Sequence, residues 1–229
     1  MGRPAEGTRE GAARLGVRLD ERAWKGMDRL LRRLAEENEV QNLTAIEDPE
    51  EATVDHLLDS LALAAVAREA GTPLEEAVLC VDIGTGGGFP GIPLALAFPT
   101  SRWLLLESEY RKVQWLGVIT GELGLTNVEV LRVRGRELRH GRADVEAAVD
   151  VVTARAVGEL GKICREARGL LRPGGVLLCP KGRRLTEEEM AVGDREARKS
   201  NLEPGVAMPM SVPGRNRVCV VYRRAEDAS

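Results

Sequence analysis

The sequence predicts an α/β fold, a doubly wound and mostly parallel sheet that follows an N-terminal helical extension. After residue 76, short apolar runs alternate with helical stretches, which is the pattern of repeated βαβ units. These runs are apolar at nearly every position, as in strands that are covered on both faces. Before residue 76 the apolar residues recur at helical spacing. We therefore divide the chain into a helical element, 1–75, and an α/β domain, 76–229.

Two helices are expected in the N-terminal element. The first covers 21–37, where leucines share one face. The second begins after Asp48, a suitable N-cap, has Pro49 in its first turn and runs to about Ala70. We expect these helices to pack on the sheet as a lid or substrate-binding element.

The α/β domain is expected to hold five strands with helices between them and one strand at its end. Strands are expected at 77–83, 102–107, 128–133, 149–154, 175–180 and 217–222, and helices at 91–98, 109–123, 158–171 and 185–200. Residues 172–175, Arg-Pro-Gly-Gly, predict a turn just before the fifth strand. Sequential strands and helices of this kind predict a parallel sheet with helices on both faces.

The most informative segment is 77–91, in which an apolar run ends at Asp82 and is followed at once by a glycine-rich loop. Glycine lets the backbone turn tightly beneath a ligand without Cβ clashes. A shifted register, Gly86, Gly88 and Gly91, matches the dinucleotide pattern G-x-G-x-x-G, so a nicotinamide cofactor is one reading. A plain glycine-rich turn is another.

Two features of this loop favour S-adenosylmethionine over a dinucleotide. Asp82 would repel a pyrophosphate, and Pro90 and Pro93 remove backbone donors that a phosphate needs. S-adenosylmethionine carries a sulfonium and an ammonium and no phosphate. Glu107 lies 25 residues after Asp82, at the end of the second predicted strand, where a carboxylate can accept hydrogen bonds from both ribose hydroxyls.

Composition limits the class of protein. The chain has 229 residues, of which 43% are hydrophobic, enough for a sizeable core. No apolar run approaches the ~20 residues that span a membrane, and no signal peptide is evident, so we expect a cytoplasmic protein. The four cysteines are far apart and predict neither disulfides nor a metal site. A net charge of −3 alone would favour a small-molecule enzyme over an RNA-binding one.

Separated motifs in the chain resemble those of one family. These motifs are Asn42–Ile46, Asp55–Leu61, Asp82–Leu94, Arg111–Val113, Ala154–Ala156 and Lys181–Gly182. Over about residues 38 to 182 the chain resembles the glucose-inhibited division protein B family (RsmG), which methylates N7 of a guanosine in small-subunit (16S) ribosomal RNA. The resemblance implies a class I (Rossmann-like) S-adenosylmethionine-dependent methyltransferase, with 76–229 as its catalytic domain.

The resemblance also implies site residues. The expected cofactor-binding residues are Asp82, Gly84, Thr85, Gly86, Gly88, Phe89, Glu107, Arg136, Glu137 and Arg155. Asp82 would face the methionine end, Glu107 the ribose, and Arg136 with Glu137 the adenine. Arg155, Lys181 and His56 would position the RNA, with the alternatives that Arg155 is an ordinary surface arginine and His56 a structural residue.

The expected chemistry needs no side-chain acid or base. Guanine N7 has an exposed lone pair, so the reaction requires alignment of donor and acceptor, which can supply on the order of 7 to 11 kcal/mol of the barrier. Residues 153–156 lack the N/D-P-P-Y/F motif of amine methylation, and Cys179 is a poor candidate nucleophile because it ends an apolar strand.

The expected partner is small-subunit ribosomal RNA or a ribosomal particle, bound by a monomer without a metal or a membrane. Basic residues on the first helix and at Lys181, Arg183 and Arg184 could meet phosphates, although the helix stripe is interspersed with acids and equally fits a solvated face. Two alternatives stay open, a small-molecule or protein methyltransferase of the same fold and a non-catalytic cofactor-binding module.

Overall fold

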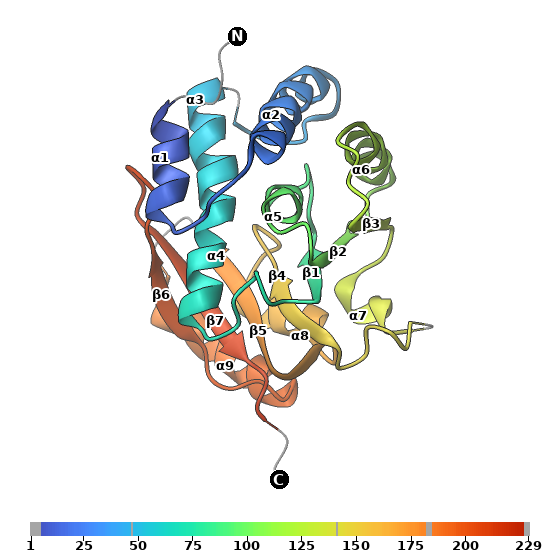
Figure 1. Ribbon diagram of the computed structural model, residues 1–229. Coiled ribbons are helices and arrows are strands. Elements are labelled where there is room, and N and C mark those ends of the chain that lie inside the picture. The colour runs from blue at the N-terminus through green and yellow to red at the C-terminus, as the bar shows by residue number, and fades with distance from the viewer. Residues whose placement is uncertain (1–5, 47, 141, 182–184, 227–229) are drawn as a thin grey trace.

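A seven-stranded sheet forms the centre of the fold (Figure 1). The computed structural model describes residues 6–46, 48–140, 142–181 and 185–226. The strands are β1 Leu79–Ile83, β2 Arg102–Leu106, β3 Val128–Leu131, β4 Val149–Thr153, β5 Leu171–Lys181, β6 Val206–Met210 and β7 Arg217–Arg223. Their spatial order is β3-β2-β1-β4-β5-β7-β6. The first five strands are parallel and β7 is antiparallel to both of its neighbours, which confirms a mostly parallel sheet.

Helices cover both faces of this sheet, as predicted. They are α1 Glu6–Arg14, α2 Glu21–Gln41, α3 Pro49–Ala52, the π-helix η1 Thr53–Leu58, α4 Asp59–Glu69, α5 Gly91–Ala97, α6 Tyr110–Glu122, α7 Gly135–Leu138, α8 Leu160–Ala167 and α9 Glu187–Lys199. Successive strand residues point to opposite faces. Cys80 therefore packs with α4, α5 and α6, whereas Val81 packs in a second cluster with α8 and α9.

The N-terminal helices belong to the same hydrophobic core as one face of the sheet. Leu30 of α2 and Leu61 of α4 share a cluster of buried side chains with Trp103 of β2. Both α2 and α4 contact α5, and Figure 1 shows α1, α2 and α4 gathered on one side of the sheet. The helical element predicted at 1–75 thus packs on the α/β domain, while its role as a lid stays a prediction.

The second predicted N-terminal helix is present but is not uniform. Asp48 caps it as expected, since its carboxylate accepts a hydrogen bond from the Glu51 amide at 2.8 Å, and Pro49 is the first helical residue. Residues 53–58 then form a π-helix before α4 begins at Asp59. Such π segments are rare and recur at functional sites. The sequence predicted one continuous helix, because the spacing of apolar residues does not distinguish a short π-helix from the α-helix around it.

Two details of the sheet differ from the prediction. Strand β5 begins at Leu171, so the predicted turn at 172–175 lies within it as an irregular segment where the pairing with β4 shifts register. Strand β6 was not expected. It is the edge strand, is mostly exposed and contains Pro209, features that weaken a strand signal in sequence.

The strand order reverses on the two sides of β1. Strand β2, next in the chain, pairs on one side of β1 and β4 pairs on the other. In open α/β sheets the crevice beyond the carboxyl ends of the strands at such a switch point is where ligands bind. The loops after β1, β2, β4 and β5 therefore define the place to look for a site.

Candidate functional site

A cavity of about 800 Å³ lies at these carboxyl ends. Its volume is within the range of small-molecule and cofactor sites. The lining residues that follow β1, β2 and β4 include Gly84, Thr85, Gly86, Phe89, Glu107, Arg155 and Ala156, and Lys181 at the end of β5 also lines it. The opposite wall comes from the N-terminal element, with Thr44, Asp55, His56 and Asp59. The structure thus brings together most of the predicted site residues from both halves of the chain.

Asp82 lies beneath the glycine loop and is fully buried. Its Oδ2 accepts a hydrogen bond from the Gly91 amide at 2.9 Å and its Oδ1 from the Thr153 hydroxyl at 2.8 Å. Burial raises the pKa of this carboxyl to about 6. A Cβ at position 91 would lie 2.9 Å from Asp82 Oδ2, so glycine is needed there for the close approach. Asp82 fixes the loop from below, and its predicted contact with the methionine end stays a prediction.

Four backbone amides of the glycine loop donate hydrogen bonds to other groups of the protein. The Gly86 amide donates to Glu107, the Gly88 and Phe89 amides donate to the Thr85 carbonyl, and the Gly91 amide donates to Asp82. A pyrophosphate needs such amides free at a helix N-terminus. This loop therefore fits a ligand without phosphate, which agrees with the preference for S-adenosylmethionine.

Glu107 joins the end of β2 to this loop. Its Oε1 accepts hydrogen bonds from the Ser108 and Glu109 amides at 2.7 and 2.9 Å, and its Oε2 accepts one from the Gly86 amide at 3.2 Å. A carboxylate has about four acceptor positions, so three are used and the side chain still lines the cavity. The geometry is compatible with the predicted ribose contact.

Four predicted cofactor residues do not line the cavity. They are Asp82, which lies beneath the loop as described above, Gly88, Arg136 and Glu137. Gly88 packs against α5, where a Cβ would come 2.4 Å from Ile92. Arg136 and Glu137 lie on α7, and both side chains are exposed. The Arg136 amide donates to the buried carboxylate of Glu166 at 3.1 Å, which fixes the helix end beyond β3. The adenine contact of Arg136 and Glu137 stays a prediction.

Phe89 and the residues around it form an aromatic and cationic wall of the cavity. The His56 ring stacks on the Phe89 ring with centroids 4.5 Å apart and an interplanar angle of 23°. The Arg155 guanidinium lies 5.5 Å from the Phe89 centroid. Its Nη1 donates to the Asp55 carbonyl at 2.8 Å and to Asp59 Oδ2 at 3.3 Å. Arg155 is therefore an anchored residue, and the reading of it as an ordinary surface arginine is wrong.

His56 is buried and neutral at pH 7. Burial first, and then the charge of Arg155, lower its pKa to about 4. Arginine can only donate, so the contact between Arg155 Nη2 and His56 Nδ1 at 3.2 Å assigns the imidazole proton to Nε2. That nitrogen lies 3.0 Å from the Thr44 hydroxyl. Both ring nitrogens are thus engaged by protein groups.

An ion cluster behind His56 was not predicted from the sequence. Arg215 binds Asp55 through two hydrogen bonds of 2.6 and 3.1 Å. Arg217 of β7 lies 3.1 Å from Asp55 and 3.3 Å from Asp59. Both carboxylates are on the η1–α4 segment and are buried. Arg215 and Arg217, at the β6–β7 strand pair, thus hold the N-terminal wall of the cavity in place. In the sequence, the one signal at this cluster was the family motif Asp55–Leu61.

Lys181 lies at the cavity but is not a free cation. Its Nζ donates to the Gly158 carbonyl at 2.9 Å and to Glu189 at 2.7 Å. Arg183 and Arg184 of the same predicted basic cluster, and Gly182 of the Lys181–Gly182 motif, lie outside the described residues. Ala156, just after Arg155, also lines the cavity and has a positive φ of 56°. Strained backbone of this kind clusters at ligand sites.

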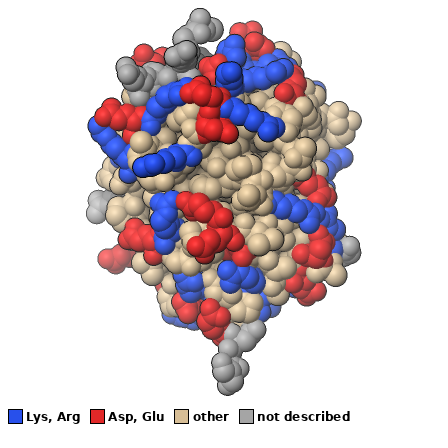
Figure 2. Space-filling model, in the orientation of Figure 1, with Lys and Arg blue, Asp and Glu red and all other residues tan. Residues whose placement is uncertain are grey.

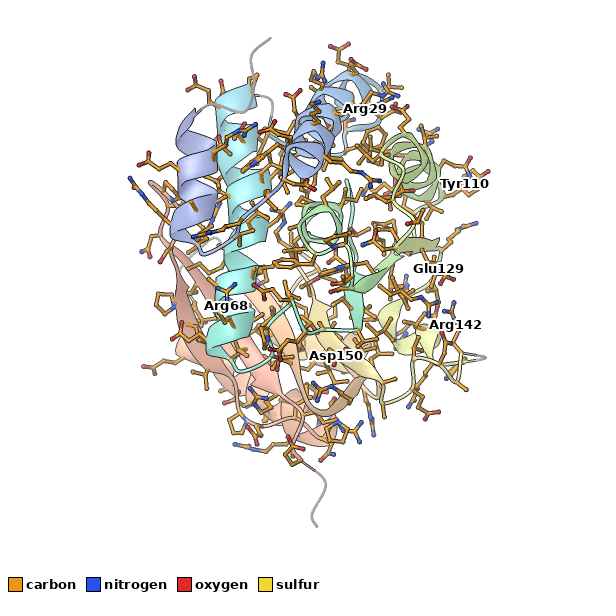
Figure 3. The ribbon with its side chains drawn as sticks, in the orientation of Figure 1. Arg29, Arg68, Tyr110, Glu129, Arg142 and Asp150 are labelled. Atoms are coloured by element: carbon orange, nitrogen blue, oxygen red, sulfur yellow. The ribbon has the colours of Figure 1, made fainter. Side chains whose placement is uncertain are left out.

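The predicted basic stripe on α2 is largely paired. Arg29 and Arg33 both bind Glu122 of α6, at 3.0 and 3.3 Å, and Arg32 binds Asp28 at 3.0 Å. Figure 3 labels Arg29 where α2 faces α6, and Figure 2 shows basic and acidic side chains interspersed on this side of the molecule. These charges fit the solvated reading and link two helices.

The described residues offer no support for several other kinds of site. Among them, no group of three or more His, Cys, Asp or Glu side chains could hold a metal ion. The helices in the described ranges include none that is long and apolar enough to cross a membrane. The four cysteines are free and buried. Burial raises the pKa of the Cys179 thiol well above its ordinary value, which disfavours a thiolate nucleophile.

Sequence comparison identifies the family to which this site belongs. The family profile described as rRNA small subunit methyltransferase G matches residues 24–215. The chain belongs to this family. The protein named ribosomal RNA small subunit methyltransferase G from Sorangium cellulosum is 42% identical over 81% of this chain and 75% of its own length. One from Chloroflexus aggregans is 39% identical over 87% of this chain and 80% of its own. Family membership confirms the resemblance and the prediction of a methyltransferase.

Solved structures confirm the fold of this family member. A methyltransferase from Aquifex aeolicus, described as dependent on S-adenosylmethionine, superposes with a TM-score of 0.58 at 17% identity over 80% of this chain and 97% of its own. Fibrillarin from Aeropyrum pernix, described with natively bound S-adenosyl-L-methionine, superposes with a TM-score of 0.52 at 22% identity over 69% of this chain and 73% of its own. The predicted class I fold is therefore confirmed.

Proposed function

We propose that this protein transfers a methyl group from S-adenosylmethionine to N7 of a guanosine in small-subunit ribosomal RNA. The observation that carries the proposal is the family match, which spans residues 24–215 and so includes both walls of the cavity. The relatives named above are described as acting on small-subunit ribosomal RNA. The cavity adds a physical argument about the reaction.

The residues present fit the cofactor. Gly84 and Gly86 have positive φ values of 64° and 58°, so their backbone can pass close under a ligand without a side chain. Glu107 would hold the ribose hydroxyls through its carboxylate. The negative charge of Asp82 beneath the loop favours the cationic methionine end over a pyrophosphate. When bound, S-adenosylmethionine supplies an electrophilic methyl group on its sulfonium.

The wall formed by Phe89, His56 and Arg155 fits a reaction that needs no general base. A general base must have a lone pair free for the substrate proton. The Nδ1 lone pair of His56 already accepts from Arg155, and its Nε2 proton faces Thr44. Guanine N7 carries its own lone pair and loses no proton. The contribution left to these residues is to hold the acceptor in line with the donor while excluding water.

The position of guanine N7 in the major groove indicates which kind of RNA structure the protein would act on. In A-form RNA the major groove is too deep and narrow for side chains to read, so the target guanosine would be unpaired or turned out of its helix. On this proposal the protein acts as a cytoplasmic monomer on ribosomal RNA or an assembling ribosomal particle. Arg155 and Lys181 would shape the RNA side of the cavity as positioning residues, because both are held by protein groups.

The experiment is methyl transfer from tritiated S-adenosylmethionine, followed by nucleoside mass spectrometry. The substrates are naked small-subunit RNA and small ribosomal subunits, both from cells that lack the gene. We expect tritium in 7-methylguanosine from at least one of them. Incorporation into another nucleoside would overturn the N7 assignment. The control is the same RNA from cells that carry the gene, which should accept little further methyl.

The second candidate is a small-molecule or protein methyltransferase of the same fold. The net charge of −3 favours it, because long-range attraction to RNA then depends on local patches. A parallel reaction with a gene-deleted extract separates the two. Tritium in the protein or small-molecule fraction, with none in RNA, would establish the second candidate, and binding of S-adenosylhomocysteine without any methylated product would indicate a non-catalytic module.

A further inference from the structure

Tyr110 presents an exposed aromatic ring beside the cavity. It is the first residue of α6, and 57% of its surface is exposed, which is unusual among the large apolar and aromatic side chains described. The Arg132 guanidinium lies over the ring at 5.3 Å from its centroid. Figure 3 labels Tyr110 beside α6 at the periphery of the molecule. The ring and the guanidinium therefore form a cation–π pair that solvent can reach.

Three arginines around this pair lack acidic partners among the described residues. Arg111, Arg132 and Arg134 are exposed, and within the described ranges none of them lies in an ion pair with a carboxylate. Residues 107–112 and 132–137 together hold five Lys or Arg and three Glu, in a chain whose net charge is −3. Glu107 is occupied by three backbone amides and Glu109 by Lys112. The positive charge of this surface is thus left for a partner.

The surface of Tyr110, Arg111, Arg132 and Arg134, called here the Tyr110 surface, lies at the rim of the cavity. Glu107 and Lys112, which flank Tyr110 in the chain, both line the cavity, whereas Tyr110 does not. Arg132 and Arg134 follow β3, which pairs with β2. If the target guanosine lies in the cavity, the nucleotides next to it in the RNA strand would cross this rim.

We propose that Tyr110 and Arg132 stack an unpaired base next to the target guanosine while Arg111 and Arg134 bind the flanking phosphates. Single-stranded RNA is recognised by stacking on aromatic rings and guanidinium planes, with cations along the backbone. A folded-protein partner would instead favour an apolar patch depleted of charge at its centre. This inference rests on the proposed function, since it assigns the RNA a second contact outside the cavity.

The test uses the full-length protein and a fluorescein-labelled single-stranded RNA copy of the methylated small-subunit segment. Binding is measured by fluorescence anisotropy at several salt concentrations. Tyr110→Ala is expected to weaken RNA binding about 5-fold or more, as loss of one stacked base does, whereas Tyr110→Phe keeps the ring and should retain the affinity. Arg134→Gln is expected to lower the slope of log affinity against log salt by about 0.7.

Two measurements show whether the Tyr110 surface acts on the RNA and not on the cofactor. The matched control is Arg198→Gln in the last turn of α9, an exposed arginine on the other face of the sheet, which should leave both affinity and salt slope unchanged. Calorimetry with S-adenosylhomocysteine should give equal affinities for wild type and every variant. An equal loss of S-adenosylhomocysteine binding in Tyr110→Ala would make Tyr110 a cofactor residue and overturn the inference.

Methyl transfer by the wild type distinguishes the two proposals. If the wild type methylates RNA and Tyr110→Ala and Arg134→Gln bind RNA as tightly as it does, the Tyr110 surface is overturned and the proposed function stands. If the wild type neither binds nor methylates RNA, both are overturned. If a duplex of the same sequence competes as well as the single strand, stacking on Tyr110 is excluded.

Discussion

Arg155 Nη2 lies 3.2 Å from His56 Nδ1, which couples the end of β4 to the π-helix of the N-terminal element. The two residues are 99 positions apart in the chain. Their contact fixes the tautomer of His56, and both lie against Phe89 at the tip of the glycine loop. The wall of the cavity is therefore assembled from three separate segments, and each of them depends on the other two for its position.

The depressed pKa of His56 predicts a pH-dependent stability. The folded-state pKa is about 4, against about 6.5 in the unfolded chain. Between these values only the unfolded state binds the proton, so stability is lost as pH falls, by about 3 kcal/mol over the whole window. His56→Asn keeps an acceptor for Arg155 and removes this dependence. Urea unfolding at about pH 4.5 and pH 7 should show the stability difference between wild type and His56→Asn shrinking by about 2 kcal/mol at the lower pH. A constant difference would contradict the buried neutral imidazole.

The raised pKa of Asp82 predicts that stability changes with pH in the opposite direction, over nearly the same pH range. Its folded-state pKa is about 6, against about 3.9 in the unfolded chain. The folded state holds the proton longer, so stability falls as pH rises between these values, by about 3 kcal/mol. Asp82→Asn can still accept from the Gly91 amide, and its urea unfolding should lack this fall. In the wild type the two pH dependences of stability oppose each other. His56→Asn should therefore show the dependence due to Asp82, and Asp82→Asn the dependence due to His56. A wild-type slope that Asp82→Asn leaves unchanged would count against a raised pKa.

Glu107→Gln should weaken cofactor binding. The single side-chain oxygen of the glutamine can still accept hydrogen bonds from the Ser108 and Glu109 amides. Its NH2 group would then face the Gly86 amide, which donates a hydrogen bond to Glu107 in the wild type. We expect the affinity for S-adenosylhomocysteine to fall about 10-fold, from lost charge-assisted hydrogen bonds. Isothermal titration calorimetry measures it. The matched control is Glu109→Gln, whose carboxylate pairs with Lys112 and whose loss should leave the affinity as it is. Equal affinity in both variants would remove Glu107 from the cofactor site.

The strand-end residues of the site could be predicted from sequence, for a geometric reason. Asp82 and Glu107 each follow a buried apolar run, and the carboxyl ends of parallel strands meet at one edge of a sheet. Arg155 follows β4 and lines the same cavity. The position of a residue at a strand end did not, however, predict which side chain it pairs with. Lys181 was expected to face RNA and is paired with Glu189, because the pairing depends on how α9 returns to the sheet.

The ion cluster of Asp55 with Arg215 and Arg217 shows why other parts of the site could not be predicted. Asp55 and Arg215 are 160 residues apart, and no local spacing links them. Their contact requires β7 to lie between β5 and β6, and β6 carries too weak a strand signal to be expected. The π-helix at 53–58 also turns Asp55 and Asp59 toward the arginines through backbone geometry that apolar periodicity does not encode.

The ion pairs of Arg29 and Arg33 on α2 predict that these two arginines do not bind RNA. Arg29 bonds to Glu122 of α6, and Arg33 bonds to Glu122 and Glu36, so a phosphate would have to displace a carboxylate to reach either of them. Arg29→Gln should therefore leave both the RNA affinity and its salt slope unchanged, whereas a residue that neutralises a phosphate contributes about 0.7 to that slope. Filter binding over a series of salt concentrations measures it. Arg22→Gln is the matched comparison, because Arg22 lies exposed on the same helix with no carboxylate in an ion pair among the described residues. A slope reduced by Arg29→Gln would show that RNA competes successfully with Glu122, and α2 would then join the Tyr110 surface as part of the RNA path.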